Sequence, residues 1–224
     1  MELLAALGSI MLINLILSGD NAVVIALASR NLPHEQRKKA VFWGSMGAVV
    51  LRIVLTLAAA YLLQIPYLQF AGGLALLWIA VKLIADDKGD VKCHEAACLS
   101  EAIKVILFAD VIMSLDNVLA IAGVANGNWM LLGIGLAMSI PLVVFGSQLI
   151  LNLMDRFPII IYAGAAILGW TAAKMVIADA AIGSMLTAYA LPIEVALTVG
   201  VVALGYWLKM RGRRGMEPAA EQPE

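Results

Sequence analysis

Three aspartates stand inside long apolar stretches of the chain, where an acidic side chain is costly. Asp20, Asp110 and Asp116 each lie many residues from the ends of the stretch that contains them. At 1.5 Å per residue, Asp110 would sit about 15 Å into a helix that begins near residue 100. Charged side chains at such depth in a bilayer face a protein interior or a wet cavity, and they mark functional sites.

Two of these aspartates belong to a short motif, Ser-x-Asp-Asn, which occurs at 18–21 and again at 114–117. On an ideal helix Asp110 and Asn117 share a face with the serine of the second motif, whereas Asp116 points about 100° away from Asn117. These polar groups would converge only if the helix is broken or rotated near the motif. The glycine of the first copy would permit such a break.

The chemistry of these side chains is that of an oxygen-rich cation site. Carboxylates, amide oxygens and exposed backbone carbonyls suit hard divalent cations such as Mn²⁺, Mg²⁺ or Ca²⁺, and do not suit copper(I), which prefers sulfur. The sequence therefore predicts a metal site inside the membrane. Its predicted ligands are Asp20, Asn21, Asp110, Asp116 and Asn117.

A basic residue, Arg52, also falls in the middle of an apolar stretch. Three ionised acids against one central arginine leave two negative charges, which a divalent cation would balance. Arg52 is either a tethered counter-ion that holds the empty acidic site together or one half of a purely structural salt bridge. The alternative for the acids is a structural role, in which they hold helices together by pairing with Arg52. The alternative for Asn21 and Asn117 is that they form hydrogen bonds between helices and bind no metal.

The composition places these residues in a membrane protein. Of 224 residues 62% are hydrophobic and 14% are charged, against about 25% charged in a soluble domain. The lipid bilayer is thus an expected partner, and a net charge of −1 gives no indication of nucleic-acid binding. Seven stretches are long enough to cross the bilayer as helices. They are 3–29, 41–64, 67–85, 100–124, 129–151, 158–178 and 191–208. The predicted fold is an all-α transmembrane domain over 1–208, followed by a disordered tail over 209–224.

Basic residues predict the orientation in the membrane. Lysines and arginines occur in the loops after the first, third and fifth stretches and in the tail, whereas the loops of the other face contain none. The positive-inside rule then puts the C-terminus in the cytoplasm and the N-terminus outside, in the cell (inner) membrane.

An internal repeat organises the stretches. Residues 14–27 and 110–123, at an offset of 96, are identical at six of fourteen positions. A second match at an offset of 92 pairs the Trp-x-x-x-Lys of 78–82 with that of 170–174. The repeat unit is three helices, about 3–85 and 100–178, with the seventh outside it. Because three is odd, the second copy enters the membrane from the opposite side, as in many secondary transporters.

Other motifs carry less chemistry. Cys93, His94 and Cys98 lie together in a hydrophilic loop, but their spacing is not that of a standard zinc pair. The loop is either a regulatory metal site or an ordinary solvated segment. The two histidines of the chain both lie in loops, so the sequence shows no catalytic constellation and an enzyme is not expected.

The repeated Ser-x-Asp-Asn motifs, at 18–21 and 114–117, resemble those of the TerC family of integral membrane proteins. The chain is most similar to the compact YjbE/YkoY-type branch, which is associated with manganese riboswitches, and the resemblance spans nearly the whole chain. It implies manganese efflux, with Asp20, Asn21, Asp110, Asp116 and Asn117 as the ion site.

Our leading hypothesis is an exporter that moves Mn²⁺ out of the cytoplasm by alternating access. Asp20 and Asp116 would hold the ion, and Asp110 would be a third ligand or the proton-carrying group. The alternatives are a membrane scaffold without transport of its own, a metal-dependent membrane hydrolase, and an exporter of another small solute such as an amino acid. Ion selectivity, transport direction, proton coupling and homo-oligomer formation stay open at this stage.

Overall fold

The structure is a computed structural model. It describes the backbone of residues 19–62, 65–85, 95–125 and 129–214. Side chains are described for residues 19–55, 65–85, 98–114 and 140–211. These parts of the chain are helical and contain no strand, which confirms the all-α prediction. The helices are α2 (Gly19–Ser29), α3 (His34–Leu62), α4 (Leu68–Ala85), α5 (Glu95–Ala125), α6 (Trp129–Arg156), α7 (Ile159–Ala178), α8 (Gly183–Leu186), the short 3-10 helix η1 (Thr187–Tyr189) and α9 (Ala190–Arg214).

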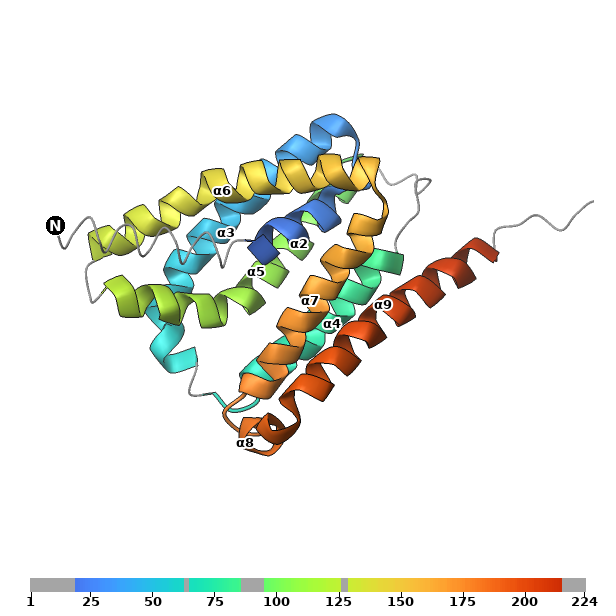
Figure 1. The fold of residues 1–224 in the computed structure, drawn as a ribbon. Coiled ribbons are helices and arrows are strands. Elements are labelled where there is room, and N and C mark those ends of the chain that lie inside the picture. The colour runs from blue at the N-terminus through green and yellow to red at the C-terminus, as the bar shows by residue number, and fades with distance from the viewer. Residues whose placement is uncertain (1–18, 63–64, 86–94, 126–128, 215–224) are drawn as a thin grey trace, which may run out of the picture.

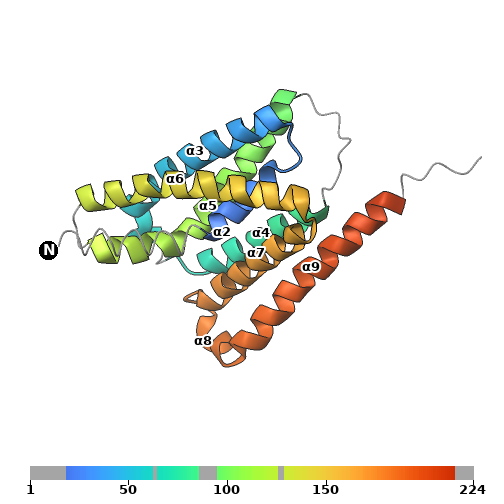
Figure 2. The same ribbon diagram turned by 45° about the horizontal axis from the view of Figure 1, so that its top comes forward.

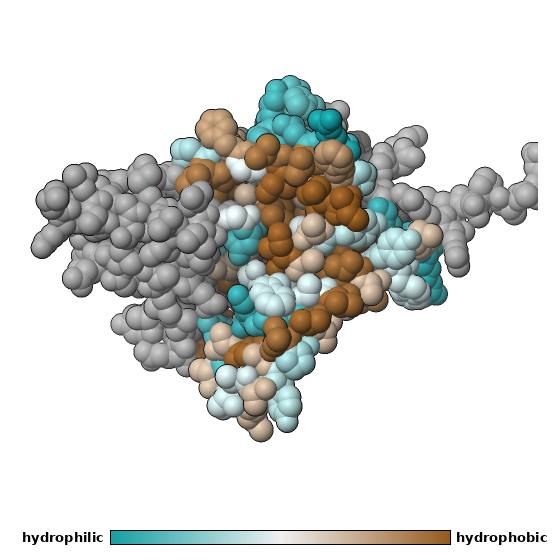
Figure 3. Space-filling model, viewed as in Figure 1, coloured by the Kyte–Doolittle hydropathy of each residue, from teal (hydrophilic) through white to brown (hydrophobic). Residues whose placement is uncertain are grey.

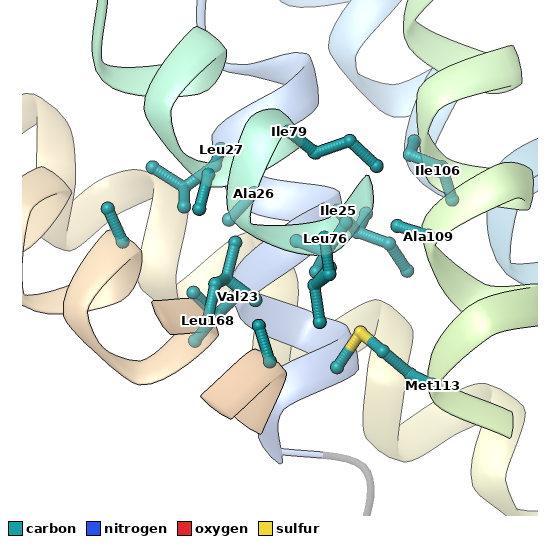
Figure 4. Packing of buried hydrophobic residues seen from close by; sticks show 14 of the residues in the cluster. Val23, Ile25, Ala26, Leu27, Leu76, Ile79, Ile106, Ala109, Met113 and Leu168 are labelled. Carbon is teal, nitrogen blue, oxygen red and sulfur yellow. The ribbon is translucent and has the colours of Figure 1, made fainter. Parts of the chain in front are cut away.

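Helix α2 is the centre of the arrangement. It packs against α3, α5 and α6 on one side and against α7 on the other, where α4, α7 and α9 form a second group (Figures 1 and 2). Every residue from Asn21 to Leu27 is buried, as expected for a helix that is apolar all round. In the core, Val23 and Ile25 of α2 lie among side chains of α4, α5 and α7, including Leu76 and Ile106 (Figure 4).

The outer surface of the bundle is apolar. Trp78, Phe145 and Val199 are more than half exposed, and apolar side chains spread over the face shown in Figure 3. So much exposed apolar surface is typical of a protein that is covered by lipid. Three segments, Leu68–Ala85, Ile159–Ala178 and Gly183–Arg211, are long and apolar enough to cross a membrane. The count of seven spans goes beyond these three and stays a prediction.

Several helices are longer than the apolar stretches that predicted them. Helix α3 begins at His34 and not at 41, and α9 continues to Arg214, so the first six residues of the predicted disordered tail are helical. Hydropathy identifies only the apolar part of a helix, which is the part suited to contact with lipid. The helix itself can continue beyond that part as long as its backbone hydrogen bonds form. Residues 179–190 contain the separate short helices α8 and η1 between α7 and α9. The first predicted span, 3–29, is described only from Gly19.

The helix ends that carry basic residues lie at one end of the bundle (Figure 1). There, Arg37 at the start of α3 pairs with Asp155 at the end of α6, with Nη1 and Oδ2 2.6 Å apart. Lys82 at the end of α4 pairs with Glu101 near the start of α5 at 3.0 Å. Both pairs are solvent-accessible and join neighbouring helices, so this end of the bundle has the polar character of a surface in water.

Helices α4 and α7 run antiparallel and approach each other closely (Figure 1). A Cβ atom built on Gly73 would lie 2.7 Å from the carbonyl oxygen of Ala172 and 2.7 Å from Cγ2 of Val176. Small residues at such positions allow helix backbones to meet, and van der Waals packing then holds the helices together in lipid.

At the opposite end of the bundle, a buried carboxylate ties the end of α7 to the start of α4. Asp179 is 2% exposed. Its Oδ2 accepts a hydrogen bond from the backbone N–H of Phe70 at 3.1 Å, and its Oδ1 accepts one from Ala181 at 2.9 Å. Burial by itself raises the pKa of the Asp179 carboxyl, but backbone N–H groups, including those of Tyr67 and Gln69, outweigh burial and hold that pKa below its usual value. The carboxylate thereby caps the first turn of α4.

We expect Gly73→Ala to destabilise the protein by about 1–3 kcal/mol, because the added methyl group meets backbone that cannot rotate away. The measurement is thermal unfolding of purified protein in detergent micelles. Gly200→Ala is the matched control, since Gly200 lies in a helix and a Cβ atom added to it would meet nothing within 4 Å apart from its chain neighbours and the backbone of its own helix. Equal stability of the two variants would show that α4 and α7 do not need this close approach.

We expect Asp179→Ala to lower the free energy of unfolding by about 1.5–3 kcal/mol at neutral pH, the usual contribution of hydrogen bonds to a charged group. Because the folded-state pKa is lowered, this stabilisation is fully present above the unfolded-state pKa of about 3.9 and is lost as the pH falls through the folded-state value. Unfolding measured from neutral pH to below pH 4 should therefore show the two proteins converging in acid. Asp155→Ala, which removes an exposed ion pair, should change stability by less than about 1 kcal/mol.

Candidate functional site

A buried ion pair joins α3 to α5 in the interior of the bundle. The side chains of Arg52 and Asp110 are 3% and 6% exposed, and Nη2 of Arg52 lies 2.5 Å from Oδ1 of Asp110. Nε of the same guanidinium lies 3.3 Å from Oδ2. The hydroxyl of Ser114 donates to Oδ2 at 3.2 Å, as the shared helix face of Asp110 and Ser114 predicted. Both oxygens of the Asp110 carboxylate therefore accept hydrogen bonds.

Helix packing explains how the guanidinium reaches the carboxylate. Asp110 is the midpoint of α5, fifteen residues from either end. In α3, a Cβ atom on Gly44 would lie 2.9 Å from Cδ1 of Ile106, and one on Gly47 would lie 2.7 Å from Cδ2 of Leu107. These two glycines let α3 lie close against α5 one to two turns before Arg52.

The first motif adds a second carboxylate to this region. Asp20 and Asn21 occupy the first described turn of α2, where Asn21 is buried and Asp20 is partly exposed. Oδ1 of Asp20 accepts a hydrogen bond from the backbone N–H of Asn21 at 2.9 Å. The charge of Asp20 also interacts with the charges of Arg52 and Asp110. Two acidic side chains from different helices thus share the surroundings of one arginine.

The second motif is described only in its backbone. Helix α5 continues without interruption through 114–117, so a break, one of the two ways in which the polar groups could converge, does not occur in this copy of the motif. Asp116 and Asn117 stand about two turns beyond Asp110 on the same helix. Their side chains lie outside the described residues, and the prediction that they join Asp20 is untested. Among the side chains that the structure describes, no group of three or more His, Cys, Asp or Glu residues is arranged to hold a metal ion.

The remaining sequence motifs lie away from this region. Lys82 stands over the ring of Trp78 at 5.6 Å, and Lys174 stands over Trp170 at 5.8 Å. Each copy of the Trp-x-x-x-Lys motif therefore forms the same contact between a lysine and an aromatic ring, one within α4 and the other within α7. This favours a structural role for the two lysines. Cys98 is disulfide-bonded, so its thiolate is not available to a metal ion in this state.

One buried acid, Asp179, was not predicted from the sequence to have a role of its own. It matches Asp87 within the repeat, and it stands one residue beyond the apolar stretch that ends at 178. Its position in the sequence, between an apolar helix and an apolar turn, could have indicated its role. A single acid in such a place needs backbone N–H groups as hydrogen-bond donors.

Comparison with known proteins agrees with this architecture. Residues 1–214 match the family described as integral membrane protein TerC family. The chain is 47% identical to the membrane protein YjbE of Bacillus subtilis (strain 168) over 167 residues, which cover 75% of the chain and 77% of that protein. It is 28% identical to the membrane protein YkoY of the same organism over 181 residues, 71% of the chain and 56% of that protein.

A more distant relative is the inner membrane protein YgdQ of Escherichia coli (strain K12), which is 25% identical over 172 residues, 68% of the chain and 72% of that protein. No solved structure matches the chain. The match over nearly the whole length and the identity with YjbE agree with the repeated Ser-x-Asp-Asn motifs. The chain belongs to the TerC family of integral membrane proteins.

Proposed function

We propose that the protein transports a divalent metal cation, Mn²⁺ in the first place, from the cytoplasm to the exterior. The observation that carries the proposal is the buried pair of Arg52 and Asp110 in the interior of a membrane protein, with the charge of a second acid, Asp20, interacting with both. Ionisable groups in such a place are costly and normally line the path of an ion or a proton. The site is formed by Asp20, Asn21, Asp110, Asp116 and Asn117.

Charge and ligand chemistry favour a divalent cation over an organic solute. If Asp116 is counted with Asp20 and Asp110, as the proposed site requires, three carboxylates stand against the one guanidinium of Arg52, and the two excess negative charges equal the charge of one divalent ion. Carboxylate and amide oxygens are also the ligands that Mn²⁺ and Mg²⁺ accept. An amino acid would bring a carboxylate of its own into this acidic region, where the Arg52 guanidinium already pairs with Asp110.

The contacts between helices support the proposed inverted repeat. In the proposed repeat, α2, α3 and α4 are equivalent to α5, α6 and α7. The contact of α3 with α5 then has its counterpart in the contact of α6 with α2, and both are present. The contact of α2 with α7 likewise has its counterpart in the contact of α5 with α4, and both are present. Helix α4 would pair with its own equivalent, α7, and the two run antiparallel (Figure 1). Repeats related in this way can rock around a central site and open it to either side in turn.

We place the protein in the cell (inner) membrane with its C-terminus in the cytoplasm and its N-terminus outside. The basic helix ends lie together at one end of the bundle, and such an end normally faces the cytoplasm. The relative YgdQ is named an inner membrane protein. In this orientation the pairs Arg37–Asp155 and Lys82–Glu101 lie at the cytoplasmic surface, whereas Asp179 lies toward the exterior.

The test is Mn²⁺ flux into liposomes that contain the purified protein and a metal-sensitive dye. We expect flux in the wild type and a loss of at least about tenfold in Asp20→Asn and in Asp116→Asn, because each removes a charged ligand. Asp155→Asn is the control, an acid in an exposed ion pair, and should transport as the wild type does.

Wild-type rates in both Asp20→Asn and Asp116→Asn would contradict the proposed site. Absence of flux in a folded wild-type protein would favour a scaffold or a transporter of another solute. Competition by Ca²⁺ and Mg²⁺ and the effect of an imposed pH gradient would then measure selectivity and proton coupling in the same liposomes.

A further inference from the structure

The outer face of α9 changes from apolar to basic toward its C-terminal end. The helix lies on the outside of the bundle, along α4 and α7 (Figure 1). Val199 and Leu204 are 60% and 48% exposed, as expected of side chains that meet lipid. The last six residues of the helix, 209–214, include one lysine and three arginines, whereas its one acidic residue, Glu194, lies near the other end. This face therefore joins an apolar length to a basic end.

Aromatic rings lie at the boundary between the two parts and contact the basic groups. Tyr206 and Trp207 are about half exposed. Cζ of Arg211 lies 5.1 Å from the centre of the Trp207 ring, and Nζ of Lys209 lies 5.4 Å from the centre of the Tyr162 ring on α7. The rings of Tyr162 and Tyr206 meet edge to face with their centres 6.1 Å apart. Aromatic side chains are enriched at the level of lipid headgroups, and attraction between cation and ring holds the basic groups at that level.

The Arg211 guanidinium is suited to an anion in this arrangement. A guanidinium has five N–H donors, and one contact with a ring leaves most of them for phosphate oxygens, which it binds well. Among the described side chains, Arg211 takes part in no ion pair. Lys82 differs in this respect, because it stands over Trp78 in the same way but pairs with Glu101 at 3.0 Å. A hollow of about 470 Å³ borders the group, and the described residues that line it are Tyr206, Trp207, Met210 and Arg211.

We propose that this face of α9 binds one anionic phospholipid, with the phosphate at Arg211 and an acyl chain along the apolar residues that precede Trp207. Arg211 stands seven residues beyond Leu204, about 10 Å along the helix, so head and chain can be contacted together. Basic groups on the surface of a membrane protein at headgroup level bind anionic headgroups. A soluble anion would use the basic end only, whereas a lipid also uses the apolar length. The inference does not depend on which solute the protein transports.

The experiment counts the lipids bound to the purified full chain by native mass spectrometry from detergent micelles. Phosphatidylglycerol is compared with phosphatidylcholine of the same chain length. We expect the wild type to bind phosphatidylglycerol more tightly, and Arg211→Gln to weaken that binding about fivefold, the loss expected for one basic residue near an anionic surface. Trp207→Leu keeps every charge and should weaken it about two- to fivefold, because the contact between ring and guanidinium is lost.

Two matched variants separate a site on α9 from general attraction between a basic surface and an anionic lipid. Lys104→Gln removes an exposed positive charge from α5, three residues after Glu101. Trp78→Leu removes an exposed tryptophan whose lysine is already paired. Both should bind phosphatidylglycerol within about twofold of the wild type, the usual scatter between independent sites. Thermal unfolding in micelles and size-exclusion chromatography report on the folding of each variant.

Equal binding of the two lipids by a folded wild type would overturn the inference. A folded Arg211→Gln that binds phosphatidylglycerol no more weakly than Lys104→Gln would overturn it too, because the attraction would then belong to the basic end of the bundle as a whole. Inorganic phosphate at the concentration of the lipid should not displace it, since phosphate cannot use the apolar length. Displacement would show that the site takes soluble anions, against the inference. The proposed Mn²⁺ transport stands or falls separately, on the flux measurement.

Discussion

The pairing of Arg52 with Asp110 is the interaction on which the interior of this protein depends. Two ions buried among apolar helices are tolerated only while they face each other, because breaking such a pair leaves an uncompensated charge that costs several kcal/mol. The distance between α3 and α5 and their rotation relative to each other are therefore restricted to narrow limits. Gly44 and Gly47 provide the close approach, and Ser114 fixes the carboxylate from its own helix. The charge of Asp20, on the central helix α2, also interacts with the charges of this pair.

The second group of helices also uses a close glycine contact, and adds a capping carboxylate to it. Helices α4 and α7 meet through small residues, with Gly73 against the backbone of α7, and Asp179 caps α4 from the end of α7. These contacts are short-ranged and involve backbone groups, so they resist both sliding and separation. Helix α9 packs along α4 and α7 on the outside of this group. The Arg52–Asp110 pair lies in the other group, between α3 and α5.

The apolar stretches of the sequence predicted the helices. The predicted ends are most accurate for helices that are apolar over their whole length. The predicted 67–85 and 158–178 agree with α4 and α7 to within one residue. The prediction failed where a helix leaves the apolar region, as at His34 and Arg214, because hydropathy reports the solvent and not the backbone hydrogen bonds. The shared face of Asp110 and Ser114 followed from spacing and is confirmed by their hydrogen bond. Which acid would meet Arg52 could not be predicted, since this depends on how α3 and α5 are rotated against each other.

The partner of Arg52 also separates the two interpretations of the buried acids. If the acids only packed helices together, one arginine would account for one carboxylate, and Arg52 does so for Asp110. Asp20 lies on a third helix, is partly exposed and adds a second negative charge that also interacts with the charge of Arg52. Packing alone gives no reason to keep a second carboxylate there, because an apolar or amide side chain would fill the space at lower cost in lipid. The proposed site, which would have to attract and release a cation, would give that reason.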